Sequence, residues 1–200
     1  MTEITTLPPA KVSEARARLL ETASKIFYTE GINTVGVDRI VADSKVTLAT
    51  FYRHFPSKQD LVLAYLQDVH DQIEHRMNEL AEANDPRSLL GAIAEDIAGQ
   101  IERPGFRGCA FIAAAAEFED RESPVRRAVA AHRGWFFDFV HTAFREVGHP
   151  RAERRARHFV MLRDGAMVGG DLDDPAEAGL TFRRGVDGLL RVIDSGPSEL

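Results

Sequence analysis

The side chains best suited to chemistry lie close together, between positions 47 and 58. They carry two hydroxyls, a phenol, an imidazole and basic groups: Thr47, Thr50, Tyr52, Arg53, His54 and Lys58. Such groups donate hydrogen bonds to phosphate oxygens and base edges in protein–DNA contacts. Between residues 37 and 58, Lys and Arg outnumber Asp and Glu, which gives the local positive charge that phosphates attract. The cluster therefore predicts a nucleic-acid contact surface.

Two short helices joined by a tight turn would position these side chains. Residues 36–43 and 47–54 have helical spacing of apolar residues, and Asp43-Ser44-Lys45-Val46 connects them. In a helix-turn-helix the first helix braces against the DNA backbone and the second enters the major groove. The predicted inner side consists of Ile40, Val46, Phe51 and Phe55, closing a small core with Ile26 and Phe27. The outer side then carries Leu48 together with the polar cluster.

The run from Thr50 to Lys58 (TFYRHFPSK) resembles the signature of the TetR (tetracycline-repressor) family, and the resemblance covers about residues 14–64. It implies that Tyr52, His54 and Lys58 contact phosphates. It also implies that Thr47, Leu48 and Thr50 face the bases or the adjacent backbone. The predicted DNA-binding set is completed by Gly36, Val37, Arg39, Lys45 and Arg53.

The sequence departs from the family pattern at three positions of this segment. Lys45 stands where glycine is common, so a positive φ there would carry a modest steric cost. Leu48 replaces a charged residue on the DNA-facing side and suits contact with a thymine methyl group. Gly36 replaces the usual hydroxyl N-cap of the first short helix, which helices tolerate.

The rest of the chain has helical periodicity and lacks a convincing strand pattern, so we expect an all-α protein with about nine helices. The further helices are expected at 12–30, 57–81, 87–102, 109–118, 124–147, 150–169 and 175–193, with a turn at 170–174. Predicted domains are a flexible arm (1–11), the helix-turn-helix domain (12–56), a helical ligand-binding and dimerisation domain (57–195) and a tail (196–200). A long helix starting at Ser57 would join the two domains.

The second domain has aromatic residues suited to the walls of a ligand pocket. Shorter stretches, at 108–112, 115–118 and 164–166, resemble one subgroup of the same family, whose members bind effectors among these helices. Candidate polar anchors are Asp96, Glu117 and His132, and each also suits a surface ion pair. Aromatic residues at helical spacing also suit a plain core. The remaining pocket candidates are Phe106, Cys109, Phe111, Phe118, Trp135, Phe139 and Met167.

The residues of the last two expected helices predict a homodimer interface, in which these two helices of each chain form a four-helix bundle. Small residues there permit close helix approach, and apolar residues supply the area, some of them facing the chain's own core. The candidates are Phe159, Leu162, Gly165, Ala166, Gly169, Phe182, Val186 and Leu189.

Three further groups of residues could suggest a metal or redox site, but the sequence favours ordinary structural roles for them. His70 and His75 are five residues apart, which places them on different helix faces, so we expect no metal site with Glu74. The aspartates at 171, 173 and 174 lack the glycine and glutamate of a calcium loop. Cys109 is the single cysteine, has apolar neighbours and fits a small buried hydrophobe better than a redox sensor.

Composition narrows the class of protein. The chain has 200 residues, and 44% of them are hydrophobic, so a folded core is expected. Its net charge of −6 argues against a protein that binds nucleic acid non-specifically through a basic surface. One cysteine, the lack of a signal-like start and the lack of a membrane-length apolar run predict a cytoplasmic protein without membrane association. Catalytic and dinucleotide motifs are missing, so neither an enzyme nor a cofactor is expected.

The functional prediction is a repressor that binds a palindromic operator as a dimer and is released by a small-molecule effector. Activation of transcription instead of repression is also compatible with the sequence. Two different classes of protein compete with a regulator: a helical protein-interaction adaptor that does not bind DNA and, less favoured, a small helical-bundle enzyme.

Overall fold

The computed structural model describes residues 13–149 and 151–191. Within them the secondary structure consists of nine α-helices and no strand, which confirms the predicted fold class. The helices are α1 (Glu14–Glu30), α2 (Val37–Ser44), α3 (Leu48–His54), α4 (Lys58–Ala83), α5 (Pro86–Ile101), α6 (Ala110–Glu117), α7 (Pro124–Glu146), α8 (Ala152–Leu172) and α9 (Pro175–Arg191). The expected N-terminal arm, the end of the last expected helix and the tail lie outside the described residues.

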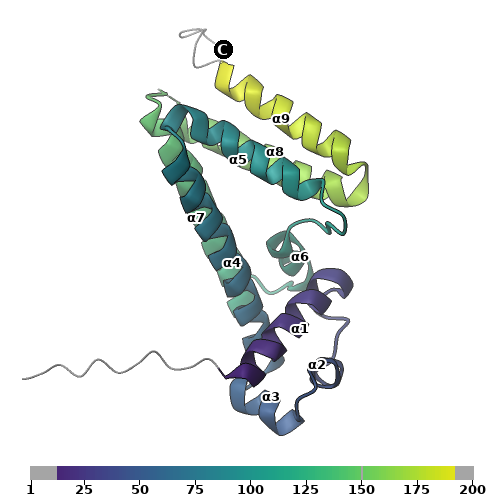
Figure 1. The fold of residues 1–200 in the computed structure, drawn as a ribbon. Helices are drawn as coiled ribbons and strands as arrows, with labels where there is room; N and C mark the ends of the chain where they lie inside the picture. Colours follow the sequence, from purple (N-terminus) through teal and green to yellow (C-terminus); the bar gives the residue numbers. More distant parts are fainter. Residues whose placement is uncertain (1–12, 150, 192–200) are drawn as a thin grey trace, which may run out of the picture. The chain divides into compact units, whose positions relative to one another are not determined.

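The chain divides into two compact units, residues 1–65 and 66–200. The division falls inside α4, after Tyr65, whereas the sequence placed a boundary at residue 56. In the first unit, α1, α2 and α3 pack together around one small core (Figure 1). Leu19, Ile40 and Phe51 are completely buried there. Leu61 in the first turn of α4 is also completely buried, and the ring of Tyr65 meets Phe27 of α1 edge to face at 5.7 Å, so the start of α4 belongs to the first unit.

Helix starts follow the capping residues that the sequence offers. The hydroxyl of Ser57 accepts a hydrogen bond from the backbone N–H of Asp60 at 3.2 Å, at the start of α4. Asp85 and Ser123 act in the same way at the starts of α5 and α7, and a proline follows each of them. Because proline has no N–H to leave unsatisfied at the first helical position, these starts are well defined.

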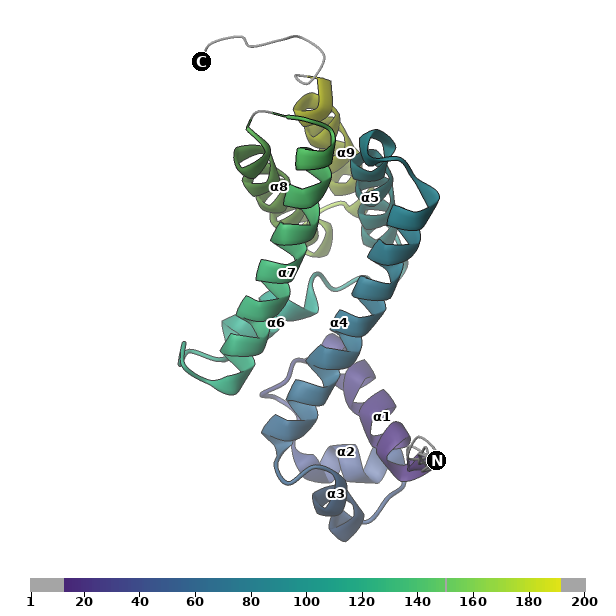
Figure 2. The same cartoon turned by 90° about the vertical axis from the view of Figure 1, so that its left-hand side faces the viewer.

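In the second unit, α5, α8 and α9 pack together, and α7 lies beside α8 (Figure 2). The apolar core includes Phe111, Phe144, Phe159 and Phe182, each at most 2% exposed. Arg183 of α9 forms ion pairs with Glu95 of α5 and with Glu102, the C-cap of α5, and these pairs link the two helices at their polar edge.

The expected turn at 170–174 is wrong at its first residues, because α8 continues through Gly169 and Gly170 to Leu172. A Cβ at Gly170 would clash with Cγ2 of the fully buried Ile101. The glycine therefore allows α8 to pack against α5 and does not end the helix. The chain turns only at Asp173 and Asp174, before Pro175 starts α9.

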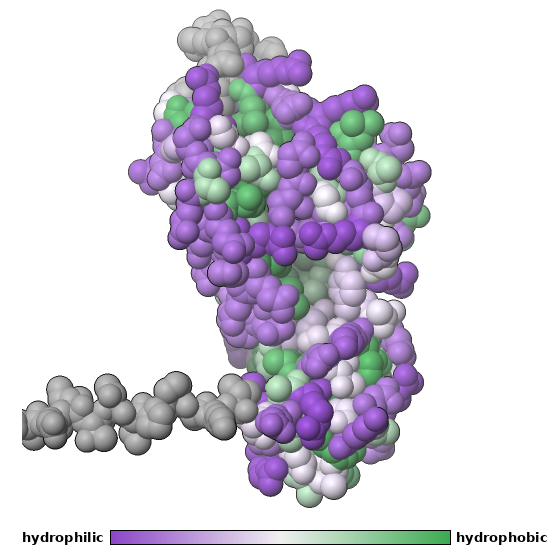
Figure 3. Space-filling model, viewed as in Figure 1, coloured by the Kyte–Doolittle hydropathy of each residue, from purple (hydrophilic) through white to green (hydrophobic). Residues whose placement is uncertain are grey.

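The surface is mainly polar, with small hydrophobic areas between the hydrophilic residues of the face seen in Figure 3. None of the helices in the described part of the chain combines the length and the apolar character needed to cross a membrane.

Candidate nucleic-acid interface

The turn between α2 and α3 depends on a left-handed residue. Lys45 has φ 54° and ψ 43°, and it is the one non-glycine residue with positive φ among the described residues. Its N–H donates to the carbonyl of Ala42 at 3.2 Å, and the N–H of Val46 donates to that of Val41 at 3.3 Å. The expected steric cost of a non-glycine residue is therefore present, and these two hydrogen bonds hold the turn closed.

The start of α3 is fixed by two hydroxyls. Thr47 is the N-cap, and its Oγ1 accepts a hydrogen bond from the N–H of Thr50 at 3.1 Å. The hydroxyl oxygens of Thr47 and Thr50 are 2.9 Å apart and share a second hydrogen bond. Leu48 is the first residue of the helix and is exposed. Phe51, on the opposite side, is fully buried, so α3 is anchored by one face and presents the other to solvent.

The remaining predicted DNA-contact residues lie at the end of α3 and the start of α4. Tyr52 and Arg53 are exposed, whereas His54 is half-buried and its Nε2 is 3.2 Å from the hydroxyl of Ser13. The ring of Tyr52 meets Phe51 edge to face at 5.2 Å. Lys58 is the first residue of α4 and is half-buried. The first unit thus brings the polar cluster onto one short segment, residues 47–58.

Arg39 is held by acidic side chains of the same unit. Its guanidinium contacts Asp43 at 2.5 Å and Glu30 at 3.6 Å, and the hydrogen bond to Asp43 raises the pKa of Arg39. This residue therefore ties α2 to the end of α1. Gly36 caps α2 in an extended conformation, and Val37 is half-buried behind it.

Comparison with known proteins identifies the family. Residues 19–65 match the sequence profile of the bacterial regulatory proteins of the tetR family. The fold also matches the crystal structure of SCO4454, a TetR-family transcriptional regulator from Streptomyces coelicolor, with a TM-score of 0.88. That match has 49% sequence identity and covers 90% of this chain and 96% of the other. The chain belongs to the TetR family. As a TetR-family regulator it has its helix-turn-helix at α2 and α3, where the sequence predicted it.

Shorter matches join this TetR-family chain to other regulators. It is 32% identical over 78 residues to YuxN of Bacillus subtilis, an HTH-type transcriptional regulator, covering 38% of this chain and 27% of that protein. It is 34% identical over 90 residues to the HTH-type transcriptional activator FasR of Mycolicibacterium smegmatis, covering 44% and 41%. The chain thus spans about a quarter to two fifths of these curated relatives. All three of these proteins are transcriptional regulators and not enzymes.

In the second unit, three predicted pocket residues form part of one aromatic cluster. The ring of His132 stacks on Phe111 at 3.6 Å with only 2° between the planes. Nδ1 of His132 is 3.0 Å from Nδ1 of His70 on α4, and Trp135 meets His70 edge to face at 4.9 Å. His132 and Phe111 are buried in this cluster. The sequence analysis considered His70 only as a metal ligand. It missed this contact because His132 lies 62 positions away along the chain.

A buried arginine lies next to the predicted pocket, and no sequence signal indicated it. Arg163 of α8 is 7% exposed. Its guanidinium donates to Asp164 at 2.9 Å and to the sulfur of Cys109 at 3.3 Å, and it lies over the ring of Phe136. Asp164 also accepts a hydrogen bond from Arg133 at 2.6 Å. Cys109 is therefore buried as predicted, but a charged group touches it.

Trp135 of the aromatic cluster and one further pocket candidate, Phe139, line an open groove of about 330 Å³. Leu89, Asp138 and Glu146 also form part of its wall. The remaining candidates are dispersed: Asp96 pairs with Arg76 at 3.1 Å, Met167 is buried, and Phe106, Glu117 and Phe118 are partly buried. The structure thus separates the predicted set into a packed cluster, a groove and scattered positions.

The predicted dimer residues also separate into two sets. Phe159, Phe182 and Val186 are at most 1% exposed and belong to the core of the second unit, and Leu189 and Ala166 are buried as well. Gly165, Gly169 and Leu162 instead line a groove of about 420 Å³ between α8 and α9, which Ala166 and Phe182 also border. The most exposed apolar residues of α8 are Met161 at 71% and Leu172 at 73%.

A metal site gains no support from the geometry. Within residues 13–149 and 151–191, His, Cys, Asp and Glu side chains do not gather in groups of three or more that could hold a metal ion. His75 instead pairs with Glu79, one turn along α4.

Burial of His132 predicts a measurable dependence of stability on pH. Burial, followed by the positive charge of Arg163, lowers the pKa of His132 from 6.5 to about 3. Below pH 6.5 the unfolded chain binds a proton at this position and the folded chain does not. The contribution of His132 to the free energy of unfolding is therefore fully present above pH 6.5. It is lost as the pH falls toward 3, by up to about 1.4 kcal/mol per pH unit.

Urea unfolding of wild type and His132→Gln between pH 7 and pH 4 would test this. Gln keeps a hydrogen-bonding group next to His70 but does not titrate, so the free energy of unfolding should fall less steeply with pH in the variant. Equal slopes in the two proteins would contradict the assignment.

Proposed function

We propose that the chain represses transcription by binding a palindromic operator as a homodimer, and that a small-molecule effector releases it from DNA. The observation that carries the proposal is the α2–turn–α3 segment of a TetR-family chain, with its exposed cluster at residues 47–58. In this mode, α3 of each subunit enters a major groove, and the two grooves lie about 34–36 Å apart on one face of the DNA.

Residue roles follow from position in the segment. Tyr52 and Lys58 bind phosphates, and the first turn of α4 adds the favourable potential of a helix N-terminus. Thr47, Leu48 and Thr50 lie against base edges or the adjacent backbone, and Arg53 and His54 lie at the end of α3. Arg39 and Lys45, although part of the predicted set, act mainly in positioning, since Arg39 is bound by carboxylates and Lys45 closes the turn.

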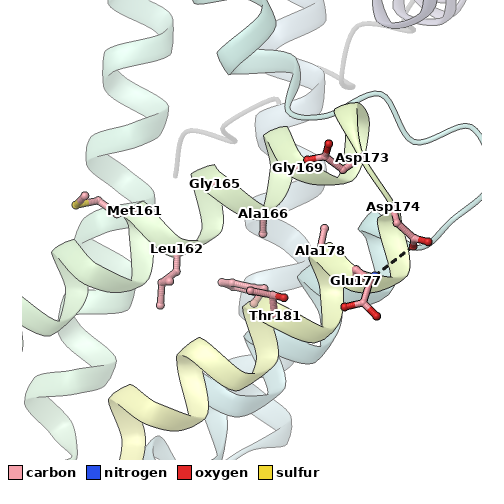
Figure 4. Close-up of a pocket in the computed structure, with 11 residues that line it drawn as sticks. Met161, Leu162, Gly165, Ala166, Gly169, Asp173, Asp174, Glu177, Ala178 and Thr181 are labelled. Carbon is pink, nitrogen blue, oxygen red and sulfur yellow. Dashed lines mark hydrogen bonds between the residues drawn. The ribbon is translucent and has the colours of Figure 1, made fainter.

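The dimer interface of this proposal is the outer face of α8 with the α8–α9 groove. Met161, Gly165, Val168 and Leu172 follow one another at helical spacing along α8, and all four are exposed. Figure 4 shows the side chain of Ala166 pointing from α8 toward α9, and Gly165, Gly169, Ala178 and Thr181 also line the groove, so small residues leave room there for an apposed helix. Such a stripe suits packing against the same face of a second copy.

The effector site of this proposal lies in the second unit, around Trp135 and Phe139. The groove there has apolar walls with few polar groups, which is the usual composition of a small-molecule site. Trp135 and His132 both contact His70 of α4, and α4 runs without interruption from Lys58 to Ala83. A ligand that moves α7 against α4 therefore has a direct route to Lys58, and its binding and DNA binding must weaken each other equally.

The phosphate role of Tyr52 and Lys58 predicts loss of affinity without loss of specificity. Tyr52→Phe keeps the ring against Phe51 and removes only the hydroxyl, so binding should weaken several-fold on every sequence tested. Lys58→Ala should also lower the salt dependence of the binding constant by about one unit of slope. Gel shifts over a range of salt concentrations measure both effects.

Lys25→Ala is the matched control for Lys58, because Lys25 is exposed on α1 and pairs with Glu21. It should leave the affinity and the salt slope unchanged. If Tyr52→Phe and Lys58→Ala bind as wild type does, residues 47–58 are not the DNA-contact segment.

The effector role of the groove predicts a fluorescence signal. Trp135 is the only tryptophan in the chain, so a small molecule that releases the operator should change the tryptophan emission of the free protein. Release should follow the same concentration dependence as the emission change, and the loss of DNA affinity should be about 5- to 150-fold. A releasing compound that left the emission unchanged would place the effector site elsewhere.

A further inference from the structure

Large apolar side chains are exposed at only two places in the described part of the chain. Four of them, Met161, Val168, Leu172 and Leu180, lie on α8 and α9, which carry the proposed dimer interface. The other two, Leu48 at 44% and Tyr52 at 49% exposure, lie on α3. The core beneath α3 is already supplied by Phe51 and Phe55, which are at most 2% exposed, so packing does not explain an exposed leucine at position 48.

The polar groups of α3 leave little hydrogen-bonding capacity for reading bases. Its seven residues, Leu-Ala-Thr-Phe-Tyr-Arg-His, contain no Asn or Gln to pair with adenine and no Asp or Glu to accept from cytosine. Arg53 is the one group there that can bind guanine in a bidentate manner. Thr50, the remaining hydroxyl of the first turn, is engaged with Thr47.

Leu48 is rigidly placed at the start of this helix. Thr47 accepts the N–H of Thr50, and Lys45 closes the preceding turn, so the backbone on both sides of Leu48 is fixed. In helix-turn-helix proteins, the N-terminal residues of the recognition helix are those that reach base edges. Leu48 and Ala49 are the exposed side chains of that first turn, and both are apolar.

We infer that Leu48 recognises the 5-methyl group of a thymine in each operator half-site. Thymine is the base with an apolar group in the major groove, and aliphatic side chains distinguish it by covering that methyl. The inference rests on the proposed function, in which α3 enters the major groove. It adds to that function how α3 recognises a base: through contact with a methyl group in place of a hydrogen bond.

Replacement of thymine by uracil tests the inference, since it removes the methyl and leaves the hydrogen-bonding groups unchanged. The probe is the duplex that wild-type protein selects from random DNA, synthesised with dU in place of dT at one position of each half-site in turn. At the contacted position, loss of one buried methyl should weaken binding about fourfold per half-site, and up to about 16-fold for both. At the other positions the affinity should not change.

Leu48→Ala should bind the dT duplex more weakly and should bind the dT and dU duplexes equally. Tyr52→Phe is the control, because it should lose affinity through the phosphates and keep the wild-type preference for dT over dU. Circular dichroism of Leu48→Ala checks the fold, and the wild-type uracil series is decisive without the variant.

A half-site without thymine, or a wild-type protein that binds every dU duplex as tightly as the dT duplex, would overturn the inference. Equal dT preference in Leu48→Ala and wild type would overturn the assignment to Leu48. If no duplex is enriched, the proposed function fails and the inference fails with it.

Discussion

Met161→Glu is expected to give a folded monomer that binds operator DNA at least about 100-fold more weakly than wild type. Met161 is 71% exposed on α8, so the new carboxylate costs the isolated chain little. In a symmetric dimer two carboxylates would be buried close together without partners, which is strongly unfavourable. A monomer must bind each half-site independently, and linked binding usually contributes about 10²–10⁴ in affinity.

Sedimentation velocity at micromolar concentration and a gel shift on the selected duplex measure the two effects. Ala130→Glu, at an exposed position of α7, is the control and should remain dimeric. Leu189→Glu would be a poorer test, because Leu189 is buried within the chain and the variant would lose its own core. A dimeric Met161→Glu protein with normal operator affinity would remove α8 from the interface.

Asp164→Ala is expected to lower the free energy of unfolding by about 3–5 kcal/mol. Arg163 is buried, and Asp164 is the carboxylate that its guanidinium contacts, at 2.9 Å. Removal of this carboxylate leaves a positive charge in the core of the second unit, and Arg133 loses the same partner. Chemical denaturation measures the change, at a fixed protein concentration because the stability of the proposed dimer would depend on concentration.

A control variant and a double variant test whether the unpaired buried charge causes this loss of stability. Asp187→Ala removes an exposed aspartate of α9 and should change stability by less than about 0.5 kcal/mol. The double variant Arg163→Met with Asp164→Ala removes the buried charge together with its partner, so it should be more stable than Asp164→Ala alone. A double variant less stable than the single one would show that Arg163 stabilises the core by itself.

The sequence allowed the helix-turn-helix and several helix starts to be predicted because their signals are local. The periodicity of Ile40, Phe51 and Phe55 defines the inner face, and the residues around Ser57, Pro86 and Pro124 mark the starts of helices. All of these signals operate within about one or two turns of helix, and the structure has the helices at those positions.

The face of α8 could not be assigned in the same way. Phe159, Met161, Met167 and Val168 are all apolar and lie on different sides of the helix, so periodicity does not separate the core from a second surface. The structure makes the separation, burying Phe159 and Met167 and exposing Met161 and Val168. The end of α8 was misplaced for a related reason: Gly170 looks like a helix stop, but contact with Ile101 requires glycine there.

Long-range polar contacts were also beyond the sequence. The His70–His132 pair and the contact of Arg163 with Cys109 join residues 62 and 54 positions apart. A single arginine in an amphipathic helix gives no indication that it is buried, because its charge is compensated only by the tertiary neighbours that the fold supplies.

Selection of DNA from a random pool by the full-length protein decides whether the chain reads a specific sequence as a symmetric dimer. We expect enrichment of a pseudo-palindrome whose half-sites are centred about 10–10.5 base pairs apart, or a multiple of that spacing, bound by two chains. A pool that shows no enriched sequence, or an enriched single half-site bound by one chain, would contradict the proposed function.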